Sequence, residues 1–191
     1  MTKKDFKILI SADDDIMRDV IKSLLLKEGY SVLSAKSGLD AIRILRVEDI
    51  NLVITDLRIQ GADGIDVMRQ AVKINPYISV VILTTFSDLD VTLEAVKEGA
   101  YDYLTKPFKI EEVSFLVDKA FRRTVLINEN RELLRYIRDT YHDMEVIKTA
   151  AQSRDPEITL NWIERIERLK SLSILTDQEV EVLKERLVKG V

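Results

Sequence analysis

The stretch Asn51-Leu-Val-Ile-Thr-Asp56 carries a carboxylate directly after a short apolar run. Such a run is typical of a strand that is buried in a parallel sheet. Other short apolar segments are followed in the same way by Asp13-Asp14-Asp15, by Thr84-Thr85 and by Lys106-Pro107. Since the carboxyl ends of parallel strands meet at the sheet edge where ligands bind, we expect these polar groups to form one site.

These groups suit the binding of a phosphoryl group. A carboxylate such as Asp56 is a poor nucleophile until the charge between it and an incoming phosphoryl group is neutralised. Mg²⁺ does this, and it prefers oxygen ligands and takes only one or two carboxylates. Lys106 offers a compact positive charge to a phosphoryl oxygen, and the Thr84 hydroxyl can donate to another. The residues therefore predict a Mg²⁺ and phosphoryl site around Asp56.

Short strand-like runs alternate with helical patterns over the first two-thirds of the chain, which indicates βαβ crossovers and a parallel sheet covered on both faces. We predict a five-stranded doubly wound α/β domain over residues 1–122, flavodoxin-like with strand order 2-1-3-4-5, followed by an all-α extension. The expected strands are 7–11, 30–35, 51–55, 79–83 and 101–104, and the expected helices are 16–27, 38–47, 65–74, 88–97 and one that begins at Ile110.

The last expected helix continues beyond the domain, because residues 111–151 contain no glycine or proline. A stripe repeats there every three or four positions, as in a coiled coil. Its members are Ile127, Asn130, Leu134, Ile137, Tyr141 and Met144. We predict an extended helical linker over 123–152 and a homodimer through helix 110–151, with an intramolecular helical hairpin as the alternative.

The remaining residues, 153–191, predict a short helical pair. Thr176-Asp-Gln-Glu179 forms a capping box at the start of its second helix. Helices this short cannot bury their apolar faces alone, so we expect them to pack on each other or on a partner chain. Residues 158–189 also resemble the short C-terminal (SHOCT) domain, through the segments 166–179 and 183–187. That resemblance implies a role in oligomerisation.

Composition excludes several classes of protein. The 191 residues carry a net charge of −4, which gives no electrostatic reason for nucleic acid or an anionic membrane to be the main partner, and direct DNA binding is not expected. There is no cysteine, which fits a reducing compartment. No signal-peptide region is found, and no stretch approaches the roughly 18 apolar residues of a membrane helix. We expect a cytoplasmic protein.

Residues 1–122 resemble the receiver domain of two-component response regulators. The motifs that carry the resemblance are Ile8-Leu9-Ile10 before Asp13-Asp14, Thr55-Asp56-Leu57-Arg58 followed by Gly61-Ala-Asp-Gly64, Ile82-Leu83-Thr84, and Gly99-Ala-Tyr-Asp-Tyr-Leu-Thr-Lys106-Pro107-Phe108. The resemblance implies a phosphoacceptor signalling protein rather than an enzyme. A phosphatase is also disfavoured because the chain has no cap domain and no second catalytic acid placed for hydrolysis.

The resemblance implies that Asp56 accepts a phosphoryl group from a sensor histidine kinase, and that Asp13, Asp56 and the backbone carbonyl of Arg58 hold Mg²⁺. The chain departs from the family at Ala12, where the first acidic residue normally sits, and we expect weakened Mg²⁺ affinity. A register shifted by one residue would restore an acidic pair as Asp13-Asp14 at the cost of a bulge. Asp14 is therefore a further candidate ligand, although one of these acids is expected to cap the following helix.

The resemblance also implies that Thr84 and Lys106 bind phosphoryl oxygens and that Tyr103 turns inward on activation. Without the family pattern, Thr85 is nearly as good a candidate as Thr84. Two function classes follow. In the first, phosphorylation controls dimerisation or the binding of an unknown downstream protein through the C-terminal helices. In the second, the site with Ala12 no longer switches, and the chain is an interaction or oligomerisation scaffold.

Overall fold

The computed structural model describes residues 1–85, 88–150, 156–171 and 175–189, without the side chains at 89, 140–150, 156–162, 165 and 186–189. The described residues form two compact units, Met1–Glu129 and Asn130–Val191.

The first unit contains a parallel sheet of five strands in the order β2-β1-β3-β4-β5. The strands are β1 (Lys7–Ser11), β2 (Ser31–Ala35), β3 (Leu52–Asp56), β4 (Ser79–Thr84) and β5 (Asp102–Thr105). All four pairings are parallel, and β1 keeps an unbroken register with both of its neighbours. The predicted flavodoxin-like order is confirmed, and each strand boundary lies within one residue of its prediction.

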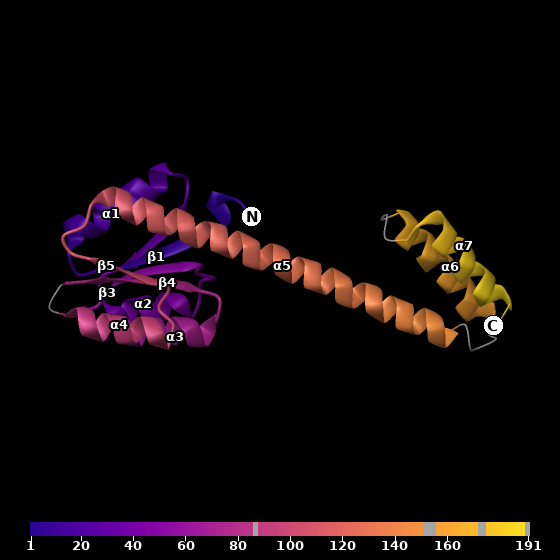
Figure 1. Ribbon diagram of the computed structural model, residues 1–191. Coiled ribbons are helices and arrows are strands. Elements are labelled where there is room, and N and C mark those ends of the chain that lie inside the picture. Colours follow the sequence, from indigo (N-terminus) through magenta and orange to yellow (C-terminus); the bar gives the residue numbers. More distant parts are fainter. Residues whose placement is uncertain (86–87, 151–155, 172–174, 190–191) are drawn as a thin grey trace. The chain divides into compact units, whose positions relative to one another are not determined.

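Helices cover both faces of this sheet. They are α1 (Asp15–Lys27), α2 (Gly38–Leu45), α3 (Gly64–Ile74), α4 (Leu89–Glu98) and α5 (Ile110–Ala150), after a short 3-10 turn η1 (Lys3–Asp5). Figure 1 shows α1 and α5 on one face and α2, α3 and α4 on the other. Alternate residues of the inner strands fill the two layers, so that Ile8 and Ile54 pack toward α1 and α5, while Leu9 and Val53 pack toward α2 and α3. This explains why these strands are apolar on both faces.

Gly64 lets α3 begin directly against the end of β3. A Cβ atom on Gly64 would lie 2.4 Å from the Asp56 carbonyl oxygen and 3.0 Å from the Leu57 Cα atom. The Gly64 amide donates to the Leu57 carbonyl at 2.9 Å, which closes the loop after β3. A side chain at position 64 would therefore displace the backbone that carries Asp56.

The first unit extends beyond the predicted boundary at residue 122, because α5 remains attached to the sheet domain there. The Phe121 ring packs edge-on against Phe6 and Tyr30, with centroid separations of 5.4 and 6.0 Å. Arg123 donates from Nη1 to the Tyr77 carbonyl at 2.9 Å and to the Ser79 hydroxyl at 3.1 Å. These contacts bind the helix to the sheet and move the boundary to Glu129.

In the second unit, the helices α6 (Pro156–Ser171) and α7 (Asp177–Lys189) pack on each other. Ile166 and Leu169 of α6 and Val180 of α7 are buried. The predicted capping box is present: the Thr176 amide donates to Glu179 Oε2 at 2.9 Å, and the Glu179 amide donates back to the Thr176 hydroxyl at 3.4 Å. The pair thus buries its apolar faces as expected.

The predicted stripe on α5 faces solvent as far as its side chains are described. Asn130 is exposed, and Leu134 and Ile137 have exposed fractions of 61% and 40%. The side chains of Tyr141 and Met144 lie outside the described residues. None of the helices in the described ranges is both long and apolar enough to span a bilayer.

Candidate functional site

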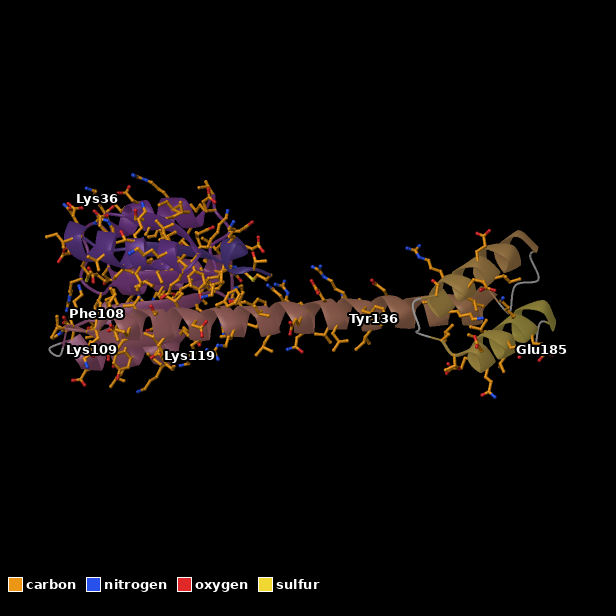
Figure 2. All side chains as sticks on the ribbon, turned by 90° about the horizontal axis from the view of Figure 1, so that it is seen from above. Lys36, Phe108, Lys109, Lys119, Tyr136 and Glu185 are labelled. Atoms are coloured by element: carbon orange, nitrogen blue, oxygen red, sulfur yellow. The ribbon has the colours of Figure 1, made fainter. Side chains whose placement is uncertain are left out.

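Asp56 is the last residue of β3, and its side chain is buried. Its Oδ1 atom forms an ion pair with the Lys106 ammonium, which follows β5. Among the described residues, neither carboxylate oxygen of Asp56 accepts a well-aligned hydrogen bond. The Lys106–Pro107 peptide bond is cis, and Phe108 and Lys109 then lead into α5 (Figure 2). The two residues that the sequence pattern selects are therefore in direct contact.

The electrostatics of the site disfavour an isolated charge on Asp56. Burial raises the pKa of the Asp56 carboxyl above its ordinary value, because the charged form loses its hydration. The Lys106 ammonium opposes this shift, whereas the nearby Asp13 carboxylate adds to it. Asp56 is thus a carboxylate that gains from any further cation placed beside it.

Asp13 is the acidic residue after β1 that reaches Asp56, whereas Asp14 has a different task. The Asp14 carboxylate accepts a hydrogen bond from the Met17 amide at 3.0 Å and so caps α1. The strand β1 ends without a bulge, and Ala12 is fully buried directly before Asp13. The structure therefore has the unshifted register, with an alanine where the family's first acid normally sits.

Arg18 fixes the loop that presents Asp13. Its side chain is buried, and Nη1 donates to the Ala12 carbonyl at 2.6 Å. The same guanidinium pairs with Asp15, whose carboxylate also lies 3.1 Å from the exposed Lys36 ammonium. Sequence reasoning did not identify this role, because a charged residue in the first turns of a helix normally faces solvent.

The donors around Asp56 fit a small divalent cation. A buried carboxylate without an aligned hydrogen bond and a second carboxylate from Asp13 supply the one or two carboxylates that Mg²⁺ takes, with water completing its shell. The carbonyl of Arg58 lies in the loop that follows β3 and is available to the same edge of the sheet. No group of three acidic or histidine side chains converges anywhere in the described part of the chain, in keeping with alanine at position 12.

Thr84, the last residue of β4, lies on the same edge with an exposed fraction of 2%. The Lys106 amide donates to the Thr84 carbonyl at 2.7 Å, which ties the lysine loop to β4. The Thr84 hydroxyl lies 3.0 Å from the hydroxyl of Thr92, a fully buried residue of α4. Thr85 is exposed, and its hydroxyl donates to Asp88 instead. The two adjacent threonines thus have different surroundings.

Two of these neighbours could not be identified from the sequence. Thr92 lies within a helical pattern and has no motif around it. Asp88 precedes α4, and its carboxylate accepts a hydrogen bond from Arg58 Nη2 at 2.8 Å, which links the loop after β3 to α4. The Arg58 guanidinium is also the main reason that the pKa of Asp88 lies below its ordinary value. The only available signal was the short spacing between Thr84 and these residues.

Tyr103, on β5, is partly buried and packs against the cluster that joins the sheet to α2 and α3. Its ring also lines a shallow depression together with the half-exposed start of α5, where Phe115 is exposed. Tyr103 therefore lies between the core and the surface. Its position is compatible with a side chain that can move inward.

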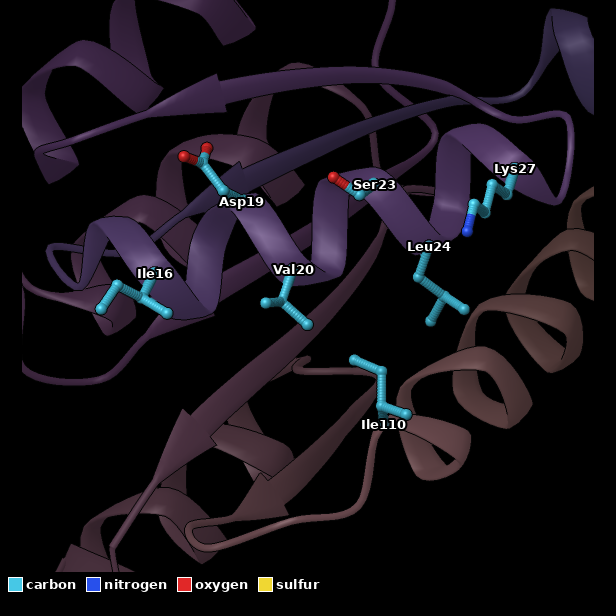
Figure 3. A pocket seen from close by; sticks show the side chains of 7 residues that line it. All are labelled: Ile16, Asp19, Val20, Ser23, Leu24, Lys27 and Ile110. Carbon is cyan, nitrogen blue, oxygen red and sulfur yellow. The ribbon is translucent and has the colours of Figure 1, made fainter.

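An apolar groove lies beside the site, between α1 and the start of α5. Val20 and Leu24 point from α1 toward Ile110, and Ile16 continues the row in the first turn (Figure 3). Ile16 and Val20 have exposed fractions of 79% and 51%. Since α1 begins two residues after Asp13, this exposed row starts at the rim of the site.

Comparison with known proteins identifies relatives of the first unit. Residues 8–118 match the family described as "Response regulator receiver domain". The transcriptional regulatory protein ZraR of Escherichia coli O157:H7 is 34% identical over 128 residues, which are 67% of this chain and 29% of ZraR. The DNA-binding transcriptional regulator NtrC of Klebsiella pneumoniae is 36% identical over 108 residues, which are 56% of this chain and 23% of NtrC. The chain thus spans less than a third of these relatives.

A solved structure has the same fold. The crystal structure of a response regulator receiver domain protein from Clostridium thermocellum is 37% identical, with a TM-score of 0.61. The match covers 64% of this chain and 98% of that one.

Proposed function

The chain belongs to the response regulator receiver domain family, and on this premise we propose that it is a two-component response regulator phosphorylated on Asp56 by a sensor histidine kinase. The observation that supports this proposal most directly is the convergence of Lys106 and Asp13 on the buried Asp56 carboxylate. Side chains from three distant segments meet there, at the edge of the sheet where α/β proteins bind ligands.

In the proposed reaction, an Asp56 oxygen attacks the phosphorus of a phosphohistidine. The bond from phosphorus to the imidazole nitrogen breaks, and that nitrogen takes up a proton as it leaves. Mg²⁺ bound by Asp13, Asp56 and the Arg58 carbonyl supplies positive charge between the carboxylate and the phosphoryl group. Lys106 already contacts the accepting carboxylate, so its ammonium is in place to bind a phosphoryl oxygen.

The phosphorylated site carries about −1.5 to −2 units of charge at one point. This charge attracts the Thr84 hydroxyl toward a phosphoryl oxygen and leaves space behind it. Tyr103, which lies between the core and the surface, then turns inward. Through these two residues the change reaches α4 and β5.

We propose that the kinase contacts the groove formed by Ile16, Val20, Leu24 and Ile110. A partner that presents a phosphohistidine to Asp56 must cover the rim of the site, and the exposed apolar row of α1 begins there. Association through such a row would bury side chains that are exposed in the free chain, which is favourable. This groove offers the kinase an anchor next to the reacting carboxylate.

The proposed output is altered self-association or partner binding through the helical C-terminal region. The exposed Leu134 and Ile137 of α5, with the exposed Tyr136 between them (Figure 2), form an apolar surface suited to a second copy of the helix. The SHOCT-like pair α6 and α7 would add to this association. Because the chain spans only part of its transcriptional relatives, its lack of direct DNA binding remains a prediction. A cytoplasmic location is part of the same proposal.

One observation favours a second function. The buried Ala12 removes an acidic group from the metal site, and a receiver that cannot hold Mg²⁺ would act as a phosphorylation-independent scaffold. The two functions differ in their response to a small phosphoryl donor.

The test is incubation of the full chain with Mg²⁺ and acetyl phosphate, followed by intact-mass measurement. A mass increase of one phosphoryl group in the wild type, absent in Asp56→Asn, supports the proposed function. Beryllofluoride with Mg²⁺ then provides a stable mimic, and sedimentation velocity measures self-association. A wild type that gains no mass at high Mg²⁺ and behaves like Asp56→Asn would instead support the scaffold.

A further inference from the structure

A pair of buried hydroxyls connects the phosphoryl-binding edge of the sheet to α4. The Thr92 hydroxyl lies 3.0 Å from the Thr84 hydroxyl and 2.9 Å from the Asp88 carbonyl, four residues earlier in the chain. Thr84 and Thr92 have exposed fractions of 2% and 0%. The proton of Thr84 has only a distant acceptor in this arrangement, the Thr85 carbonyl at 3.4 Å. Thr84 is therefore held mainly as the acceptor of Thr92.

The hydroxyl pair can be broken at low energetic cost. Thr92 has one proton and two acceptors, so it keeps the Asp88 carbonyl when Thr84 leaves. No buried donor is then left without a partner, which avoids the penalty for an unsatisfied polar group. A phosphoryl oxygen is a charged acceptor, and hydrogen bonds to charged groups are roughly twice as strong as neutral ones. A phosphoryl group on Asp56 would thus compete successfully for Thr84.

We propose that Thr92 is a positioning residue that holds Thr84 in the resting state, and that phosphorylation releases this hold and detaches α4 from the end of β4. The inference rests on the proposed phosphorylation of Asp56. It assigns to a residue of α4, outside the reacting groups, control over how readily the site accepts a phosphoryl group or its mimic. Removing the Thr92 hydroxyl should therefore favour the active arrangement.

A second link between the site and α4, the ion pair of Arg58 with Asp88, does not have this role. The Arg58 side chain is 73% exposed, and exposed ion pairs contribute little because water screens them. It joins the loop after β3 to α4 but does not touch Thr84. The buried hydroxyl pair is the connection that changes when Thr84 moves.

The experiment compares the full-length wild type with the variants T92V, T92A and T92S. Each protein is titrated with beryllofluoride at saturating Mg²⁺, and bound fluoride is measured by fluorine NMR. T92V and T92A, which lack the hydroxyl, should bind beryllofluoride about fivefold more tightly, the factor expected when one neutral hydrogen bond no longer stabilises the resting state. T92S keeps the hydroxyl and should bind like the wild type.

The chain offers a matched control in Thr124. This threonine is also buried in a helix, and its hydroxyl donates to the carbonyl four residues earlier, that of Ala120, at 3.1 Å. It lies on α5 and does not contact the site, so T124V should leave beryllofluoride affinity unchanged while it reproduces any general loss of stability. Damage to the fold would weaken binding, whereas the proposal requires tighter binding.

The outcomes separate this inference from the function on which it rests. If the wild type binds beryllofluoride and T92V and T92A bind equally or more weakly, the role of Thr92 is wrong and the proposed function stands. Equal tightening by T124V would also overturn it. If neither the wild type nor Asp56→Asn binds, both the proposed function and the inference fail.

Discussion

The Lys106 ammonium forms an ion pair with the Asp56 carboxylate across the end of β4, which lies between the strands that carry the two residues. Asp56 is almost fully buried, whereas the Lys106 side chain is 31% exposed. Burial outweighs this single cation, since the pKa of Asp56 remains above its ordinary value. The free site thus holds a carboxylate whose charge is only partly compensated.

The first prediction concerns stability and pH without metal. Because its pKa is higher in the folded chain, protonated Asp56 favours folding. This contribution is fully present below the unfolded-state pKa and is lost as pH rises through the folded-state pKa. Asp56→Asn lacks the charge, so it should be more stable than the wild type at neutral pH by on the order of 1 kcal/mol. The difference should shrink as pH falls toward about 4. Urea unfolding in a chelator measures it, and a gap that widens at low pH would contradict the assignment.

The second prediction concerns Ala12. Ala12→Asp adds a third carboxylate beside Asp13 and Asp56, and Mg²⁺ affinity should increase about tenfold, or about 1.4 kcal/mol. Ala12→Asn has nearly the same shape without the charge and serves as the control. Mg²⁺ titration followed by tyrosine fluorescence gives both affinities. An equal effect of the two substitutions would show that size rather than charge at position 12 determines metal binding.

The third prediction concerns the groove on α1. Ile16→Lys places a charge on a residue that is 79% exposed, so the fold should tolerate it. Phosphotransfer from a histidine kinase that phosphorylates the wild type should slow at least tenfold, because the apolar contact is lost. Phosphorylation by acetyl phosphate should be unchanged, since this donor needs no docking surface.

Val47 provides the control for that experiment. It is 80% exposed and follows α2, at the opposite edge of the sheet from Asp56. Val47→Lys should leave both rates as in the wild type. If it slows phosphotransfer as much as Ile16→Lys does, then added charge rather than the groove is responsible.

The fourth prediction concerns α5. Replacing Leu134 and Ile137 by lysine removes the exposed apolar surface of the helix, and the dissociation constant for self-association should rise at least tenfold. Sedimentation equilibrium measures it, with Val47→Lys again as the control. Phosphorylation of Asp56 by acetyl phosphate should continue normally. A double variant that associates like the wild type would remove this surface as the dimer contact.

The sheet could be predicted closely because its signals are local. Apolar runs mark the strands, and Gly29, Gly99 and Asn75-Pro76 end the intervening helices near the predicted positions. The contact of Asp56 with Lys106 follows from topology alone, because both residues lie at carboxyl ends of parallel strands. These features need no knowledge of side-chain packing.

Other features depend on packing that no local pattern reveals. Arg18 and Thr92 are buried at positions where a helical pattern predicts solvent exposure. The boundary after residue 122 was misplaced because the contacts of Phe121 and Arg123 join elements far apart in the sequence. The SHOCT resemblance of the last helices remains a prediction, since it rests on about thirty residues.

The attachment of α5 by Phe121 and Arg123 has an evolutionary consequence. These residues grip β1, β4 and the loop before β4, well away from the phosphoryl-accepting edge. The direction in which the helix leaves the domain is therefore set independently of the chemistry. Different effector modules can be grafted after residue 129 in the same helical phase without redesign of the acceptor, which makes this anchor a natural exchange point between lineages.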